Sequence, residues 1–281
     1  MNFDRPIFII GTSRSGTNIL YKLFTTHKNT AYFENNSSRF YKKPFMFRFI
    51  PVLMKYQKLK YKIDRPKTSE GWVWDRFFTP LQHLNESHAT NDVKNYYFNA
   101  ISNQLKAFNA NRFVGSNPRN CMRIKWLNNM FPNANYIIIT RDTKSVINSM
   151  YQIITKKRKK WGKKFLEPPS TLRGYGHIKK MLGENDSDFQ TCLDWYKLYK
   201  NTLDNDLELV NERTIHVKYE DFVKDSRNTI KTLYDFTGLE WYDELNSQIP
   251  EHVDLTRNER WKLLPDKEKE ILLDFVRKTN I

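Results

Sequence analysis

Short runs of apolar residues alternate along this chain with longer segments in which apolar residues recur every three or four positions. The runs that predict strands are Ile7–Ile10, Thr30–Phe33, Arg112–Gly115, Asn135–Thr140 and Thr214–Val217. The segments that predict helices are Gly16–His27, Asp92–Asn109, Arg119–Met130, Lys144–Lys157, Phe189–Leu209, Arg227–Thr237 and Asp266–Lys278. Buried strands that alternate with helices are typical of βαβ units. The pattern therefore predicts an α/β fold of three layers, with a central, mostly parallel sheet of about five strands flanked by helices.

Two segments interrupt this alternation, although the chain has no internal repeat or long linker and is expected to form a single domain over residues 1–281. Residues 36–90 are an apparent insertion after the second strand. Aromatic and basic residues mix from Phe40 to Ile63, which favours either an amphipathic helix packed on the domain or a lid or membrane-surface patch. Residues 156–188 begin with a dense basic run and continue through Pro and Gly, which predicts a mobile basic loop, either solvated or attracting an anion.

Charge and cysteine content narrow the class of partner and compartment. The chain has 47 Lys and Arg against 31 Asp and Glu, a net charge of +16, which indicates an anionic partner: a nucleotide, an acidic acceptor, nucleic acid or a membrane surface. Cys121 and Cys192 are the only cysteines, too few for a disulfide framework or zinc site. The N-terminus has no signal-peptide pattern, and no apolar run reaches the length of a membrane span. We therefore expect a cytoplasmic protein.

A glycine-bounded loop connects the first strand to the first helix and has the sequence Gly11-Thr12-Ser13-Arg14-Ser15-Gly16-Thr17. Its N–H groups and the helix N-terminus converge on one point and favour an anion there. The two glycines have the spacing of a nucleotide phosphate loop, G-x-x-x-x-G-K-[ST], but Thr17 replaces the Lys and Asn18 replaces the metal-binding hydroxyl residue. Arg14 adds a fixed fork of donors. The loop predicts phosphate-anchored group transfer that does not use a metal ion.

A second candidate phosphate pocket follows the fourth strand. Arg141 stands at the carboxyl end of that strand, where open α/β sheets bind ligands. Ser149 lies eight residues farther on, two helical turns away, so that it can face the same side as Arg141. The local alternative is an ordinary surface Arg beside Asp142 acting as a helix cap.

Two further motifs have a nucleotide-binding and a packing interpretation. Tyr219 follows the last strand and either contacts a base or is a structural residue at the sheet edge. Arg260, Trp261 and Lys262 lie in a Pro-bounded loop near the C-terminus, where the two cations and the indole either close over a base and its phosphate or pack the loop.

Taken in this order, the motifs resemble those of the sulfotransferases that use 3′-phosphoadenosine-5′-phosphosulfate. The resemblance rests on the Gly11–Thr17 loop, His27, Arg119–Ile124, Phe131-Pro132, Arg141 with Ser149, Tyr219-Glu220-Asp221 and Phe236–Leu239. It implies a phosphate-loop domain in which Ser13, Arg14, Ser15, Gly16, Thr17 and Asn18 hold the 5′-phosphosulfate. It further implies that Arg141 and Ser149 hold the 3′-phosphate, and that Tyr219, Arg260, Trp261 and Lys262 close over the adenosine.

The reaction that this resemblance implies is in-line transfer of a sulfuryl group to a hydroxyl or amine, with adenosine 3′,5′-bisphosphate as the other product. A sulfuryl group carries less charge than a γ-phosphoryl group, so Arg14 and backbone donors can stabilise the transition state without a metal ion. Small-molecule members of the family place a His base after the third strand, where this chain has Ser116-Asn117-Pro118. We predict Glu34, at the end of the second strand, as the general base, and the alternative is a solvated Glu at a strand end.

Several points stay open at this level. Asp75 and His83 are the fallback bases, and Arg119 or Arg123 replaces a cationic helper that the family often places after the third strand. Trp72, Trp74, Phe77 and Phe78 either line an acceptor cleft within the insertion or form plain core. The acceptor is unidentified, with an anionic molecule, a carbohydrate and a lipid-linked glycan as candidates. Peripheral membrane contact is a further candidate, and no nucleic-acid partner is expected.

Two other function classes compete with sulfuryl transfer. A P-loop kinase or NTPase would share the phosphate loop, but it would need the Lys and the metal-binding carboxylate that the sequence does not supply. A non-catalytic basic module for nucleic acid or another polyanion would explain the charge, but it would not require two ordered phosphate sites.

Overall fold

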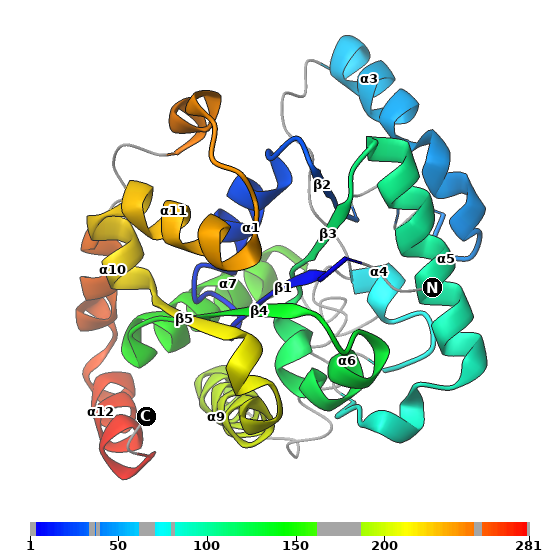
Figure 1. Ribbon diagram of the computed structural model, residues 1–281. Helices are drawn as coiled ribbons and strands as arrows, with labels where there is room; N and C mark the ends of the chain where they lie inside the picture. The colour runs from blue at the N-terminus through cyan, green and yellow to red at the C-terminus, as the bar shows by residue number, and fades with distance from the viewer. Residues whose placement is uncertain are drawn as a thin grey trace.

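The computed structural model describes residues 4–33, 37, 40–61, 71–79, 82–161, 187–249 and 255–279. At its centre lies a five-stranded sheet in the order β2-β3-β1-β4-β5 (Figure 1). The strands are β1 (Ile7–Ile10), β2 (Thr30–Ala31), β3 (Arg112–Gly115), β4 (Asn135–Thr140) and β5 (Thr214–Lys218). Each pairing between these strands is parallel, so the predicted α/β class is confirmed.

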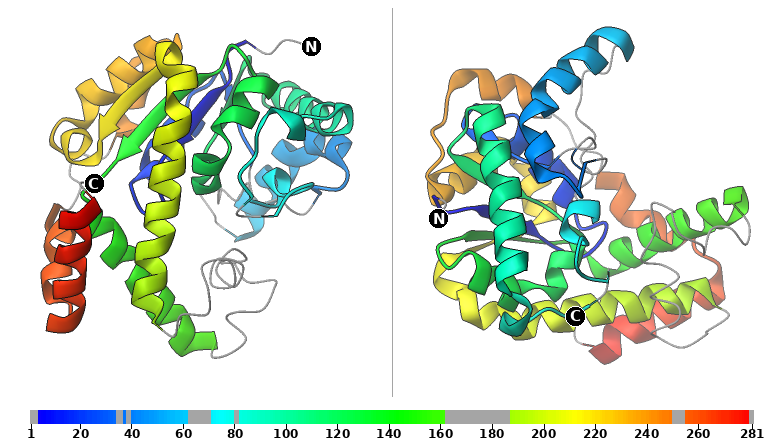
Figure 2. Two further views of the ribbon diagram at one scale, coloured as in Figure 1. Left: turned by 90° about the horizontal axis from the view of Figure 1, so that it is seen from below. Right: turned by 90° about the vertical axis from the view of Figure 1, so that its right-hand side faces the viewer.

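Alternating side chains of the central strands enter two separate apolar cores, which makes three layers (Figures 1 and 2). In β1, Phe8 and Ile10 join one core, whereas Ile7 and Ile9 join the other, as the period of two in a strand requires. The first core includes residues of α5 (Asn91–Phe108), α6 (Ile124–Met130), α7 (Thr143–Trp161) and α9 (Asp188–Leu207). The second includes residues of α1 (Thr17–Thr25), α10 (Tyr219–Lys224) and α11 (Ser226–Thr237).

The remaining elements decorate this frame. They are η1 (Pro44–Phe49), α3 (Ile50–Tyr61), α4 (Gly71–Trp74), η2 (Glu86–His88), η3 (Pro118–Met122), η5 (Glu208–Arg213), η6 (Asp243–Gln248), η7 (Leu255–Leu263) and α12 (Asp266–Thr279). The last helix, α12, packs beside α7 and α9. None of the helices within the described ranges is long and apolar enough to cross a membrane.

The helix predicted over Arg119–Met130 is wrong in its continuity, because the structure divides it into η3 and α6. The break falls at Arg123, whose backbone has φ −138° and ψ 12°, outside the α region. Its fully buried guanidinium donates to the carbonyl of Trp74 (3.2 Å) and to Asp75 Oδ1 (2.7 Å). Because a buried charge must be hydrogen-bonded, these contacts override the local helical pattern.

The helix predicted to end at Lys157 continues to Trp161 as part of α7. Lys and Arg are good helix formers, and cations near the C-terminus of a helix interact favourably with its dipole. The first part of the predicted mobile loop over 156–188 is therefore helical, which corrects that boundary. Residues 162–186 lie outside the described part of the chain.

The segment that mixes aromatic and basic residues forms η1 and α3, so the predicted helix is confirmed over Ile50–Tyr61. Of the insertion predicted over 36–90, residues 36, 38–39, 62–70 and 80–81 lie outside the described ranges. From the side, α3 projects outward from the body of the domain (Figure 2, right).

Candidate functional site

The loop after β1 is a tight turn with two left-handed residues. Ser15 donates its backbone N–H and its hydroxyl to the carbonyl oxygen of Thr12, at 3.1 and 2.8 Å. Arg14 has φ +75° and Gly16 has φ +107°. A left-handed conformation costs a residue other than glycine on the order of 1 kcal/mol, and such residues cluster at functional sites. The turn therefore directs the first N–H groups of α1 into the space beside Arg14.

A cavity of about 360 Å³ opens at the carboxyl ends of β1 and β4, on the sheet edge where parallel α/β folds bind ligands. It is lined by Arg14, Gly16, Thr17, Asn18, Ile19, Arg141, Ser145, Asn148, Ser149, Gln152, Tyr219, Arg257 and Arg260. This lining, taken over the described residues, contains arginines and no Asp or Glu. The cavity is therefore suited to a ligand with several negative charges.

The first predicted phosphate pocket and the second lie side by side in this cavity. Arg14 donates its Nε–H to the hydroxyl of Ser149 over 3.0 Å, and Arg141 donates to the backbone carbonyl of Arg14 over 3.2 Å. Burial lowers the pKa of Arg14, and the nearby charges of Arg141 and Arg257 lower it further. An anion in the cavity would relieve this repulsion between cations.

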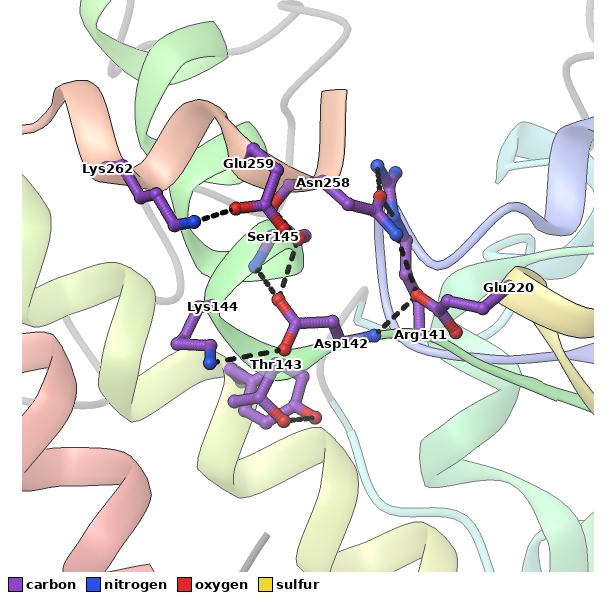
Figure 3. Close-up of polar contacts among 10 residues, drawn as sticks. Arg141, Asp142, Thr143, Lys144, Ser145, Glu220, Asn258, Glu259 and Lys262 are labelled. Atoms are coloured by element: carbon purple, nitrogen blue, oxygen red, sulfur yellow. Dashed lines mark hydrogen bonds and ion pairs between the residues drawn. The ribbon is translucent and has the colours of Figure 1, made fainter. Parts of the chain in front are cut away.

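The guanidinium of Arg141 is held from several sides (Figure 3). Its Nε–H donates to Asn258 Oδ1 over 2.9 Å, and a second N–H donates to the same oxygen. Its Cζ lies 4.4 Å from the centre of the Tyr219 ring. Glu220 Oε1 accepts from the side-chain amide of Asn258 (2.9 Å) and from the backbone N–H of Asp142 (3.1 Å). The fork is thus oriented before any ligand binds.

Asp142 caps α7, which is the role that the alternative interpretation of this motif predicts for it. Its Oδ1 accepts from the backbone N–H of Ser145 at 2.8 Å. The Ser145 hydroxyl lies 2.7 Å from the same carboxylate oxygen and 2.8 Å from the carbonyl oxygen of Asn258. The cap fixes the start of α7, so Ser149 stands at a defined position beside Arg14.

The structure does not bring every predicted residue into the cavity lining. Ser13 and Ser15 are outside it, and Ser15 is fully buried with its hydroxyl used in the turn. Trp261 packs against the core, with Lys144 Nζ 4.8 Å from its ring centre. Lys262 forms an ion pair with Glu259 on the side of η7 away from Arg141 (Figure 3). Of this C-terminal trio, Arg260 alone lines the cavity.

Seven residues that line or support the cavity had no predicted role there: Ile19, Ser145, Asn148, Gln152, Glu220, Arg257 and Asn258. The sequence carries a signal for three of them. Ser145, Asn148 and Gln152 recur with Ser149 at helical spacing, which makes a polar stripe along α7. Glu220 belongs to a motif that the sequence singles out, and Arg257 and Asn258 precede another, but no spacing marks them as contacts of Arg141.

Of the three candidate bases, the structure describes Asp75 and His83. Glu34 lies outside the described residues. The side chain of Asp75 is almost fully buried, and its two oxygens form ion pairs with Arg119 and Arg123. His83 Nε2 lies 2.9 Å from Asp206 Oδ2, near the end of α9, and neither residue lines the cavity.

The aromatic cluster of the insertion is partly core. Trp74 is fully buried and stacks on Tyr97 with ring centres 5.2 Å apart, whereas Phe77 is exposed. The side chain of Trp72 lies outside the described part of the chain. Within the described residues, no group of three or more His, Cys, Asp or Glu is placed to hold a metal ion.

Gly16 gives a test of the turn. A methyl group there would lie 2.5 Å from Tyr219 Cδ2, at a backbone conformation that other residues avoid. We expect Gly16→Ala to lower the free energy of unfolding by about 3 kcal/mol, because strain and overpacking add. Denaturant titration measures this. Gly238→Ala is the matched control: its φ is +68°, but the nearest atom is the flexible end of Arg5 at 3.0 Å, so we expect a loss of about 1 kcal/mol. Equal losses would contradict the role of the ring contact.

Comparison with known proteins bears on the family and the fold. A model described as the sulfotransferase family matches residues 6–243. Sulfotransferase STF9 from Mycobacterium avium is 14% identical, with a TM-score of 0.59 over 99% of this chain and 76% of that one. The sulfotransferase domain from the curacin biosynthetic pathway is 15% identical, with a TM-score of 0.57 over 100% and 99%. Sulfotransferase STF1 from Mycobacterium tuberculosis H37Rv is 17% identical, with a TM-score of 0.54 over 97% and 76%. At these identities the solved structures bear on the fold alone.

Proposed function

Since this chain belongs to the sulfotransferase family, we propose that it transfers a sulfuryl group from 3′-phosphoadenosine-5′-phosphosulfate to a hydroxyl or amine. The observation that carries the proposal is the shared cavity. Arg14, beside the start of α1, and Arg141, after β4, line one cavity together with Ser149, and its described lining contains no Asp or Glu. A nucleotide with phosphate groups at both ends of its ribose needs two adjacent anion sites of this kind.

We infer the following roles for the chain's own residues. The first N–H groups of α1, at Thr17 and Asn18, and the guanidinium of Arg14 would bind the phosphosulfate end. Arg141 and Ser149 would bind the 3′-phosphate, supported by Asn258. Arg257 and Arg260 of η7 also line the cavity and add positive charge to it.

The co-substrate supplies an activated sulfuryl group whose bond to the bridging phosphate oxygen breaks as the acceptor oxygen or nitrogen bonds to sulfur. Arg14 would donate to the oxygens on which negative charge grows, and its pre-formed position would spare reorganisation in the transition state. A base must remove the acceptor proton. Glu34, which follows β2 in the sequence and lies outside the described residues, remains our candidate for that base. The acceptor is proposed by chemical class alone: a carbohydrate, a lipid-linked glycan or an anionic molecule.

The first test is thermal unfolding with adenosine 3′,5′-bisphosphate. At a concentration about 100 times Kd, a ligand that binds the native state adds about 2.7 kcal/mol, which for a chain of this size is an increase in Tm of about 5 °C. Adenosine 5′-monophosphate should shift Tm less, because it lacks the group that Arg141 would bind. A shift with ATP and Mg²⁺ but none with the bisphosphate would overturn the proposal in favour of a kinase. A shift for the bisphosphate justifies a screen of acceptors with labelled sulfate.

A further inference from the structure

We propose that η1 and α3 dock the enzyme on an anionic lipid bilayer. The surface consists of Phe45, Phe49, Val52 and Tyr56 with the cations around them, and it is called the α3 face below. It is distinct from the cavity and does not depend on the proposed reaction.

The α3 face is apolar and exposed to solvent. The exposed fractions are 49% for Phe45, 47% for Phe49, 68% for Val52 and 57% for Tyr56. Val52 and Tyr56 are four residues apart in α3, and Phe49, the last residue of η1, precedes Val52 by three, so this spacing places the three side chains on one side of the segment. Single exposed apolar residues are normal, but a row along one projecting helix marks an interaction surface.

The opposite side of the same segment is fixed to the domain. Phe47 and Ile50 are fully buried in the first core, and the Phe47 ring lies 5.7 Å from that of Phe33, centre to centre. Tyr96 of α5 donates its hydroxyl to the carbonyl oxygen of Tyr41. Burying the α3 face therefore requires no unfolding of the segment, and α3 itself projects from the body of the domain (Figure 2, right).

Charge selects a bilayer of anionic lipid as the occupant. From Asn35 to Ile63 the sequence has no Asp or Glu, and its cations are Arg39, Lys42, Lys43, Arg48, Lys55, Lys58, Lys60 and Lys62. Arg48 donates to the carbonyl of Phe45 over 3.1 Å, and its Cζ lies 5.9 Å from the Phe49 ring centre. Lys42, Lys43 and Lys55 are exposed and stand within three positions of Phe45 or Tyr56 in the sequence. An exposed apolar, aromatic face together with nearby cations is typical of helices that lie at the surface of anionic membranes.

A second copy of the chain fits this surface less well. Pairing two α3 faces would bring two sets of like charges together, which costs free energy unless acidic groups separate them. A lipid headgroup layer instead supplies the opposite charge and accepts the apolar side chains.

The test is co-sedimentation of the full chain with vesicles of phosphatidylcholine, with and without about one third phosphatidylglycerol. We expect binding to the anionic vesicles alone. Phe49→Ser with Val52→Ser should lower the partition coefficient at least about tenfold at any salt concentration, because apolar burial is lost. Lys42→Gln with Lys43→Gln should lower it about twentyfold at low salt and less at high salt.

Matched controls are Leu209→Ser on η5 and Lys267→Gln on α12, which remove an exposed apolar residue and an exposed cation elsewhere. Both should bind vesicles as the parent chain does. All variants should retain the same Tm and the same response to adenosine 3′,5′-bisphosphate, so a failed nucleotide test and a failed membrane test are distinguishable. Equal binding to neutral vesicles, loss of binding in the controls, or a dimer broken by the Phe49 and Val52 changes with no vesicle binding would overturn the proposal.

Discussion

Replacing Arg14 by Gly is expected to lower sulfuryl transfer by about 100- to 1000-fold while making the protein more stable. The loss of activity follows from removal of a donor that acts on developing charge in a preformed site. The gain in stability, about 1 kcal/mol, follows from the left-handed backbone at Arg14, which Gly adopts without strain. Opposite signs for activity and stability are the signature of strain retained for function.

A matched variant separates the two effects. Arg14→Ala also removes the guanidinium but keeps a Cβ at φ +75°, so it should lose the same activity without the gain in stability. Activity is measured as release of adenosine 3′,5′-bisphosphate with an acceptor from the labelled-sulfate screen, and stability by denaturant titration. If Arg14→Gly kept the parent activity, Arg14 would have no part in the transfer step.

Replacing Arg141 by Ala is expected to weaken the binding of adenosine 3′,5′-bisphosphate by about 100-fold. Loss of one partner of a buried, charge-assisted contact typically costs about 3 kcal/mol. The side chain is already held by Asn258 and lies over Tyr219, so little entropy is lost when it binds an anion. Calorimetric titration measures the affinity. Arg141→Lys should recover part of it, since the charge remains but the fork does not.

A merely structural role of Arg141 would give a different pattern. The parent chain should prefer the bisphosphate to adenosine 5′-monophosphate, and Arg141→Ala should remove most of that preference by weakening the bisphosphate alone. Equal weakening of both nucleotides would mean that Arg141 shapes the cavity without binding the 3′-phosphate. Arg277→Ala, an exposed Arg on α12, should change neither affinity.

The parts of the site that could be predicted from sequence are those that depend on local chain geometry. β1 and β4 are buried on both faces, so they appear as continuous apolar runs, and the residues after them fall on one edge of a parallel sheet. The helical repeat alone predicts that Ser149 can face the same side as Arg141. The two glycines alone predict the phosphate loop between β1 and α1.

The parts that could not be predicted depend on contacts between distant segments. Asn258 reaches Arg141 because η7 and α12 return to pack on α7, where Leu264 and Leu272 are buried in the core. No sequence pattern near Asn258 predicts its contact with Arg141. Similarly, the break at Arg123 depends on Asp75, which lies far away in the chain. In both cases a polar group is positioned by tertiary packing, which overrides local propensity.

The contribution of η7 to the site implies that a functional fragment of this protein must extend beyond the residues that match the family. The region that matches the family ends at residue 243, yet Arg257, Asn258 and Arg260 follow it. A fragment cut at the end of the match would keep the sheet, the phosphate loop and Arg141. It would leave Arg141 without the amide oxygen that orients it, and would uncover core residues beneath η7 and α12. A survey of activity across related chains would therefore score such fragments as inactive for a reason unrelated to their catalytic loop.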